Sequence, residues 1–215
     1  MNISFGITVH NEGKYLRNLL DFIFNNIGDY SHEIVIVDDF SDDEDTRNIL
    51  EDVGLSPIVS IYQHHFNNNY SAQKNFLNSK CNGAYIFQID ADELPSEYIL
   101  QNIHKILSSY DVDLCWVPRI NTVKGLTQEH IQQWKWRVNE KGWVNWPDYQ
   151  CRIYKNIPSV KWKNKVHEVI EGYKSSAHLP EIEKCALSHH KTIDKQEQQI
   201  DKYFKMVKAD SRSEG

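Results

Sequence analysis

The chain has 215 residues and a formal net charge of −6 at pH 7. Its length suits one domain with a core of its own, and the acidic balance argues against a general nucleic-acid binder, because no basic excess is available to neutralise phosphates. No stretch of the sequence approaches the length of a membrane span, and the short apolar run at the start lacks the basic segment of a secretion signal. We therefore expect a cytoplasmic protein without a transmembrane segment, a composition that also fits a peripheral protein at a membrane surface.

Two periodicities alternate along the first half of the chain, where apolar runs predict buried strands and apolar residues at three- and four-residue spacing predict helices. The predicted strands cover residues 3–9, 33–39, 57–63, 84–90 and 112–118. The predicted helices cover residues 11–27, 41–53, 70–80 and 96–109, with Ser41 as the N-cap of the second. Strands that are apolar throughout and separated by helices indicate an α/β fold with a doubly wound, mostly parallel sheet covered on both faces. Ligands bind such a sheet at the carboxyl ends of its strands.

The residue pattern of the sequence changes near residue 119. The segment that follows, to about residue 165, is rich in tryptophan and lacks long helical periodicity. Short strands are predicted at residues 149–155, 166–172 and 183–190. We interpret residues 1–190 as one domain, in which residues 119–190 shape a second, smaller subsite beside the first half, residues 1–118. Residues 191–215 form a polar tail that is predicted to be helical.

Three Asp-x-Asp patterns occur in the chain, and their surroundings separate them. Residues 43–45 lie in the first turn of a predicted helix, where acids interact favourably with the helix dipole, and residues 111–113 lie in a polar connection. Only Asp90 and Asp92 end an apolar strand, where alternation directs both side chains to the same side. Two such carboxylates repel each other, so a bound Mn²⁺ or Mg²⁺ with phosphate and water ligands explains them. The alternative is an acidic loop that caps the next helix at Ser96.

A second acidic pair, Asp38 and Asp39, ends the second predicted strand. Acids at this place can accept hydrogen bonds from a nucleobase N–H and a ribose hydroxyl, as in other doubly wound nucleotide sites. Capping of the following helix by the same residues is the alternative. Because no glycine-rich phosphate loop follows any strand, a nucleotide would have to be held by a metal, side chains and the backbone at the strand ends.

Together these motifs resemble glycosyltransferase family 2, whose members have the GT-A fold. Residues 7–16 resemble the family's opening strand, loop and helix, residues 33–46 its uridine-binding strand, and residues 70–96 the stretch from its basic helix to its Asp-x-Asp motif. The second half is similar to a subgroup related to lipopolysaccharide-core β-glucosyltransferases, through a Pro-Arg-Ile-Asn stretch, WPDYQCRIYKN, VHEVIEG and a late histidine near SHHK. The resemblance covers roughly residues 3 to 208 in collinear order.

The resemblance implies a metal-dependent enzyme that moves a sugar, with inversion, from a nucleotide-diphosphate sugar to a hydroxyl of a glycan, lipid-linked or protein acceptor. The donor is expected to be a UDP-sugar and the sugar a hexose. Residues 1–118 would be the nucleotide-sugar-binding half of a GT-A catalytic domain, and residues 119–190 its acceptor-side half. The residues implied to bind the nucleotide or support its loop are Thr8, Asn11, Glu12, Asp38, Asp39, Lys74 and Asp90. The implied ligands of Mn²⁺ or Mg²⁺ are Asp92, Asp90 and His167.

The same resemblance places a catalytic acid near Glu168. We predict that Glu168 is the general base, with His167 as metal ligand or phosphate contact, and that Asp148 is the competing base. Because neighbouring side chains on a strand point to opposite faces, His167 and Glu168 can serve one site only if the strand ends or bends there. An ordinary hydrogen-bonded histidine is the alternative for His167. His189 and His190 are further possible metal or phosphate contacts, although structural roles are favoured for both.

Trp143 and Trp146 lie in a predicted loop, where their rings could stack on the sugar of an acceptor. Core packing is the alternative for each tryptophan.

Two other functions fit part of the pattern. A haloacid-dehalogenase-like phosphatase also has an apolar strand followed by Asp-x-Asp, but here three predicted strands come first and Leu94 stands where threonine or valine is usual. A non-catalytic module that binds a nucleotide sugar or a glycan would bind the donor without transferring its sugar.

Overall fold

The structure, a computed structural model, describes residues 2–28 and 31–211. Its strands are β1 (Ile3–Val9), β2 (His32–Asp38), β3 (Val59–Gln63), β4 (Tyr85–Asp90), β5 (Glu93–Pro95), β6 (Leu114–Lys124), β7 (Val144–Lys155), β8 (Lys161–Lys163), β9 (Val169–Glu171), β10 (Ser176–His178) and β11 (Leu187–Thr192). Its helices are α1 (Gly13–Asn26), α2 (Glu44–Val53), α3 (Tyr70–Lys80), α4 (Glu97–Tyr110), α5 (Gln128–Trp134) and α6 (Ile193–Ser211), with a 3₁₀ turn at Glu183–Cys185.

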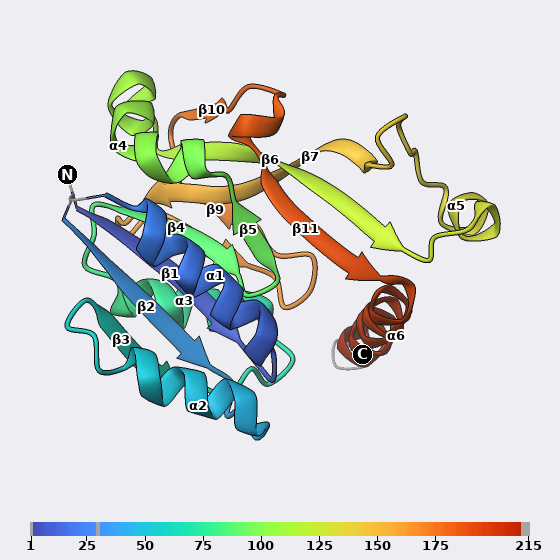
Figure 1. Ribbon diagram of the computed structural model, residues 1–215, viewed down its shortest axis with the longest axis horizontal. Helices are drawn as coiled ribbons and strands as arrows, with labels where there is room; N and C mark the ends of the chain where they lie inside the picture. The colour runs from blue at the N-terminus through green and yellow to red at the C-terminus, as the bar shows by residue number, and fades with distance from the viewer. Residues whose placement is uncertain (1, 29–30, 212–215) are drawn as a thin grey trace.

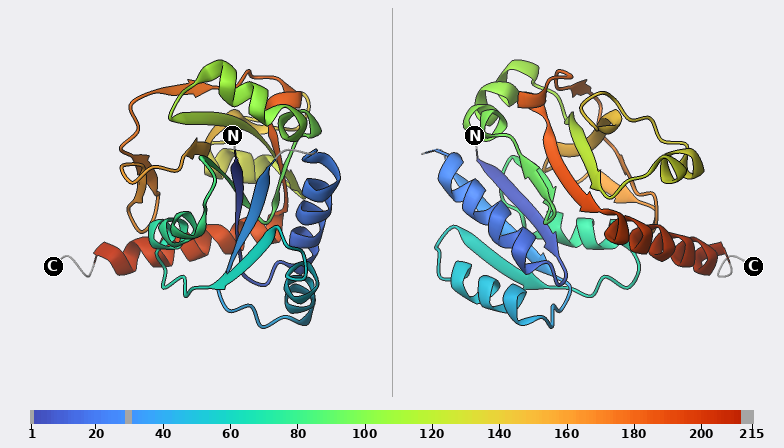
Figure 2. Two further views of the ribbon diagram at one scale, coloured as in Figure 1. Left: turned by 90° about the vertical axis from the view of Figure 1, so that its left-hand side faces the viewer. Right: turned by 45° about the vertical axis from the view of Figure 1, so that its right-hand side comes forward.

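The first four strands form the parallel half of one sheet, whose order is β3-β2-β1-β4-β7-β6-β11-β5 (Figure 1). Alternate side chains of these strands serve two cores, because successive residues point to opposite faces. Phe5 and Ile36 lie in the core that α1 and α2 cover, whereas Val35 and Ile86 lie in the core that α3 covers. Figure 2 shows these helices on opposite faces of the sheet. The predicted α/β fold with a doubly wound, mostly parallel sheet is confirmed.

The second half of the chain completes the same sheet with both strand directions. Strand β7 lies between β4 and β6 and is antiparallel to both, while β11 is parallel to β6 and antiparallel to β5. The strand predicted at residues 166–172 is shorter than expected and includes only β9. His167 has a left-handed backbone conformation, with φ of 55°, which a regular strand cannot contain. The predicted strand at 149–155 corresponds to the end of β7. Only the second half of the strand predicted at 183–190 lies in β11, because residues 183–185 form the 3₁₀ turn.

Helices α2 and α5 differ from the sequence prediction. Asp43, not Ser41, is the N-cap of α2, and its carboxylate accepts a hydrogen bond from the Thr46 N–H at 2.8 Å. The Ser41 hydroxyl instead accepts the Asn11 N–H at 3.0 Å, which ties the loop after β1 to the loop after β2. Helix α5 was not expected, because seven residues that begin with a Thr127 capping box are too few to show a periodicity.

The predicted tail, residues 191–215, contains the 19-residue helix α6, and residues 212–215 lie outside the described residues. Helix α6 follows β11 directly, and its far end extends away from the sheet in the right-hand view of Figure 2. Within residues 2–28 and 31–211, no helix combines the length and the apolarity needed to cross a membrane.

Candidate active site

A cavity of about 1380 Å³ lies at the carboxyl ends of the parallel strands. The predicted site residues that line it are Thr8, Asn11, Glu12, Asp39, Lys74, Asp90, Asp92, Asp148, His167 and Glu168. Side chains from α6, among them Lys195, Gln199 and Tyr203, form a further wall, which the sequence did not indicate. The folding of the chain therefore brings most of the predicted residues to one place.

Asp90 ends β4 and faces a buried guanidinium. Arg152 donates to its carboxylate at 2.5 Å, and the Gln88 amide donates to the other oxygen at 3.4 Å. Burial raises the pKa of Asp90, but the charges of Arg152 and Lys74 outweigh this effect, so the pKa lies below its usual range. Asp90 is thus ionised and fixed in direction. It does not cap α4, because the Ser96 hydroxyl accepts the Ile99 N–H at 3.1 Å and serves as that cap.

Asp92 contacts His189 on β11 and Lys195 on α6. Its Oδ2 lies 3.3 Å from His189 Nε2 and 3.2 Å from Lys195 Nζ. Burial raises the pKa of Asp92, yet the hydrogen bond and charge of His189 and the charge of Lys195 hold it well below its usual range. Lys195 also donates to Glu12 at 3.2 Å, so one ammonium ties α6 to the loop after β1. Burial and the charge of Asp92 raise the pKa of Glu12.

Glu168 and Lys74 form an ion pair at 2.6 Å, with side chains that are only 14% and 9% exposed. The Lys74 ammonium also lies 4.1 Å from the centre of the Trp162 ring. The predicted diphosphate contact and the predicted base are therefore bonded to each other. The left-handed backbone conformation at His167 interrupts the predicted strand, so His167 and Glu168 can both line the cavity.

Asp148, the competing base, is held by several donors. Its Oδ2 accepts hydrogen bonds from Arg119 at 2.7 and 2.9 Å and from the Asn121 amide at 2.7 Å. Its Oδ1 accepts one from Gln150 at 2.8 Å. Burial raises the pKa of Asp148, but the charge of Arg119 and the bond from Asn121 outweigh this, and the pKa is lowered.

The two acids at the end of β2, Asp38 and Asp39, have different environments. Asp38 is 2% exposed and does not line the cavity; its oxygens accept the Ser41 N–H at 2.9 Å and the Gln63 amide at 3.3 Å. The structure therefore does not bring Asp38 to the cavity with the other predicted nucleotide contacts, and its carboxylate closes the turn after β2 instead. Asp39 lines the cavity, and its Oδ1 accepts the Phe66 N–H at 2.9 Å.

The predicted acceptor residues Trp143 and Trp146 are not brought to the cavity. Their rings pack edge to face with centres 5.0 Å apart, and Lys141 lies 4.5 Å from the centre of the Trp143 ring. The two rings thus pack together outside the set of residues that line the cavity. Trp136, from the segment between α5 and β7, is the tryptophan that lines the cavity.

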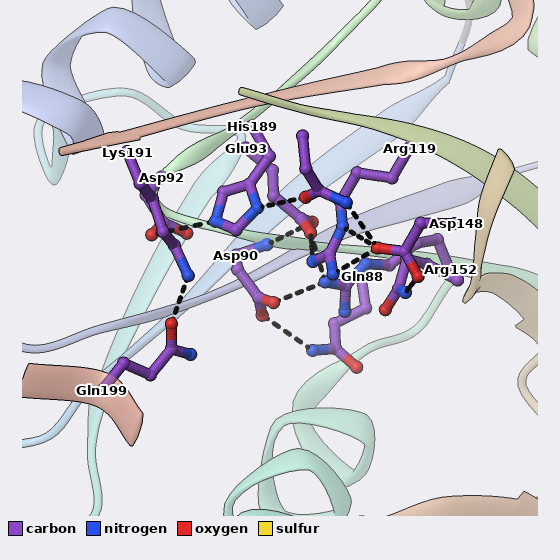
Figure 3. A network of polar contacts seen from close by, with 12 residues as sticks. Gln88, Asp90, Asp92, Glu93, Arg119, Asp148, Arg152, His189, Lys191 and Gln199 are labelled. Carbon is purple, nitrogen blue, oxygen red and sulfur yellow. Dashed lines mark hydrogen bonds and ion pairs between the residues drawn. The ribbon is translucent and has the colours of Figure 1, made fainter. Parts of the chain in front are cut away.

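Three charged residues near Asp90 were not found from the sequence: the buried Glu93 and Arg152 and the half-buried Arg119. Figure 3 shows them between Asp90 and Asp148. Arg152 is only 3% exposed between the apolar residues Cys151 and Ile153, and Glu93 is 1% exposed directly after the Asp-x-Asp motif. A charged residue flanked by apolar ones was the available signal, because such a residue is almost never fully buried without a partner.

The fold is the GT-A fold. A crystal structure of residues 1–349 of S. aureus TarS in complex with UDP-GlcNAc matches it with a TM-score of 0.62 at 15% sequence identity, over 88% of this chain and 58% of that chain. A longer crystal structure of S. aureus TarS matches with a TM-score of 0.61, over 88% of this chain and 37% of that chain. At this identity the likeness concerns the fold.

The chain belongs to glycosyltransferase family 2. The sequence profile described as Glycosyl transferase family 2 matches residues 4–172. The SPbeta prophage-derived glycosyltransferase SunS of Bacillus subtilis (strain 168) is 26% identical over 177 residues, which are 81% of this chain and 36% of SunS. An uncharacterized glycosyltransferase of Rickettsia typhi is 30% identical over 110 residues, 51% of this chain and 34% of that relative. The chain thus spans about a third of the length of these two relatives.

Proposed function

We propose that this chain transfers a sugar from a UDP-sugar to an acceptor hydroxyl. One observation carries the proposal: in a member of glycosyltransferase family 2, Asp39 follows β2, Asp90 and Asp92 end or follow β4 on the other side of β1, and all three line one cavity. The presence of UDP-GlcNAc in a TarS structure of similar fold supports a UDP-sugar as the donor. The acceptor is a hydroxyl of a glycan, a lipid-linked molecule or a protein.

The nucleoside would lie against the ends of β1 and β2. Asp39 uses Oδ1 for the Phe66 N–H, so Oδ2 can accept a hydrogen bond from a base N–H or a ribose hydroxyl. Phe66 and Tyr70 line the same cavity and would border the base. Thr8 and Asn11, at the end of β1 and just after it, complete this part of the proposed donor site.

Asp92 and His189 suit a divalent cation such as Mn²⁺ or Mg²⁺. The Asn121 amide donates to Asp148, so its oxygen must accept from His189 Nδ1, at 2.7 Å. When a cation is bound, the ring would be neutral with its proton on Nδ1, so that Nε2 and Asp92 Oδ2, which lie 3.3 Å apart, could both face the ion. Histidines that bind metals are oriented in this way by their second nitrogen. We therefore propose His189, in place of His167, beside Asp92.

The rest of the coordination shell would come from the substrate. In the described ranges, 2–28 and 31–211, no group of three or more His, Cys, Asp or Glu residues is arranged to hold a metal. Such ions normally complete their shells with phosphate oxygens and water. When bound, the cation would act as a Lewis acid that neutralises charge on the departing diphosphate.

A carboxylate must accept the proton of the attacking hydroxyl. We propose a single inverting displacement with Glu168 as the base. Glu168 accepts a hydrogen bond from Lys74 at Oε1, whereas both oxygens of Asp148 are engaged, by four hydrogen bonds in all, and its pKa is lowered. Asp148 is the alternative. Glu168→Gln and Asp148→Asn distinguish them: the variant that lacks the base should lose about 10²–10⁴-fold in kcat, and the other should lose much less.

Two rival functions have their own tests. A phosphatase of the haloacid-dehalogenase type needs an aspartate nucleophile at the position of Asp90, but here Arg152 bonds to that carboxylate at 2.5 Å. Trapping of an aspartyl phosphate would favour it. A non-catalytic module would bind donor and metal and release no UDP.

The proposal extends to three finer points that rest on the sequence resemblance and composition. The transferred sugar is a hexose, the subgroup is that of the lipopolysaccharide-core β-glucosyltransferases, and the protein works in the cytoplasm, at a membrane surface if its acceptor is lipid-linked.

A thermal-shift panel of UDP-, GDP-, CMP- and dTDP-sugars, each with and without Mn²⁺, tests the donor and the metal together. A ligand at a hundred times its Kd stabilises the folded state by about 2.7 kcal/mol. We expect the largest shift with a UDP-sugar and Mn²⁺, followed by release of UDP when the acceptor is supplied. No shift with any nucleotide sugar would refute the proposal.

A further inference from the structure

Glu93, at the start of β5, is a carboxylate with no access to solvent. Its side chain is 0% exposed, and its Oε1 accepts hydrogen bonds from Arg119 at 2.7 Å and from Arg152 at 2.5 Å. Its Oε2 accepts the backbone N–H of Asp90 at 3.3 Å. A buried charge is costly unless it is paired and hydrogen-bonded. All three donors that satisfy Glu93 belong to the active site.

Each arginine that Glu93 holds also holds a carboxylate of the cavity. Arg152 donates to Asp90 at 2.5 Å, and Arg119 donates to Asp148 through two nitrogens at 2.7 and 2.9 Å. The result is one continuous chain of contacts, Asp90–Arg152–Glu93–Arg119–Asp148, which we call the carboxylate–guanidinium chain (Figure 3). Its members come from β4, β5, β6 and β7, and Glu93 is its central link.

The carboxylate–guanidinium chain fixes the orientations of its side chains as well as the distances between them. A guanidinium is planar and presents its donors in a rigid fork, so an arginine held at one edge has little freedom at the other. Arg119 uses Nη1 for Glu93 and Nε with Nη2 for Asp148. Arg152 uses the same Nη2 for both Glu93 and Asp90. Arg119 therefore cannot reorient together with Asp148 without straining its bond to Glu93, and a shift of Glu93 would displace the one Arg152 nitrogen that Asp90 shares with it.

We propose that Glu93 is a positioning residue that sets the donor-side carboxylate Asp90 and the acceptor-side carboxylate Asp148 relative to each other. The inference rests on the proposed function, since Asp90 is assigned there to the donor. It gives the fourth residue of the Asp-Ala-Asp-Glu stretch a role that does not involve contact with the substrate.

The test is a double-mutant cycle on the affinity for UDP, measured by titration calorimetry in the presence of Mn²⁺. If Glu93 acts through Asp90, Glu93→Gln should raise the Kd about tenfold in the wild-type background, because a displacement of about 1 Å in a site is costly. In an Asp90→Asn background the same change should add less than about twofold, since residues that act in one network are not additive. Glu97→Gln, on the exposed first turn of α4, is the matched control and should bind UDP as the wild type does.

The cycle separates positioning from general destabilisation. A purely structural role would lower the thermal unfolding temperature and leave the two effects additive, and that result would overturn the proposal. Unchanged UDP affinity in Glu93→Gln would overturn it as well. Glu93→Asp, which keeps the charge but is one methylene shorter, is run in parallel with the same expectation, so the test stands if Glu93→Gln does not fold. Failure of the wild-type protein to bind UDP would instead refute the proposed function.

Discussion

Replacement of Lys74 by methionine breaks the ion pair with Glu168 while keeping a side chain of similar length on α3. Both partners are mostly buried, and their atoms are 2.6 Å apart. Loss of one partner from a buried pair costs about 3–5 kcal/mol, and we expect about 3 kcal/mol here because Glu168 keeps some contact with solvent. For a chain of this size that loss corresponds to a fall in Tm of roughly 6 to 12 °C.

The assay is urea and thermal unfolding, followed by circular dichroism, of Lys74→Met, Glu168→Gln and the double variant. The double variant should be less destabilised than the sum of the singles by about 2 kcal/mol, because it leaves no unpaired charge. Lys80→Met, on the same helix, is the control: its ammonium only lies over Tyr62 and Phe76, and its loss should cost at most about 1 kcal/mol. Additivity of the two single changes within about 0.5 kcal/mol would show that the pair does not act as a unit.

Three further predictions concern the metal, α6 and the thiols. Asp92→Ala should abolish the Mn²⁺-dependent part of the thermal shift. Asp43→Ala, in another Asp-x-Asp pattern, should only cost about 1 kcal/mol of stability, because it removes the N-cap of α2. A Mn²⁺ effect that persists in Asp92→Ala would contradict the assignment of Asp92 to the metal. Lys195→Met should tighten Mn²⁺ binding several-fold in a calorimetric titration, because the Lys195 ammonium is hydrogen-bonded to Asp92 Oδ2 and repels the ion. Unchanged or weaker Mn²⁺ binding would refute this competition. Burial raises the pKa of Cys81 and Cys151 to about 12 and that of Cys115 to about 11. A thiol reagent at pH 8 should therefore react very slowly with the folded protein, and with all four cysteines in denaturant. Rapid reaction of the folded protein would contradict the burial of the cysteines.

The sequence predicted those parts of the fold and site that local patterns determine. Apolar runs located β1 to β4, and the end of an apolar run singled out Asp90 and Asp92 among three similar motifs. The partners of these acids could not be predicted from local patterns, because Arg152 lies 62 positions from Asp90 in the sequence and Lys195 lies 103 positions from Asp92. Which of two adjacent acids faces a ligand is also a matter of tertiary structure, and it separated Asp39 from Asp38.

Side-chain surroundings decided the remaining assignments. The same aromatic character that suggested Trp143 and Trp146 as stacking surfaces lets them pack on each other instead. His189 was considered with its neighbour His190, and only the register of β11 beside β6 places it between Asn121 and Asp92. The predicted division at residue 190 stays a prediction, although α6 contributes directly to the cavity.

The position of β7 restricts how the molecule can move. Because β7 is hydrogen-bonded to β4 on one side and to β6 on the other, the proposed donor-side and acceptor-side halves share one continuous sheet. Two halves joined in this way cannot swing apart about a hinge in the manner of enzymes that close around a substrate by domain rotation. Adjustment to acceptors of different size would therefore fall to segments outside the shared strands, chiefly α5 with its flanking loops and the far end of α6.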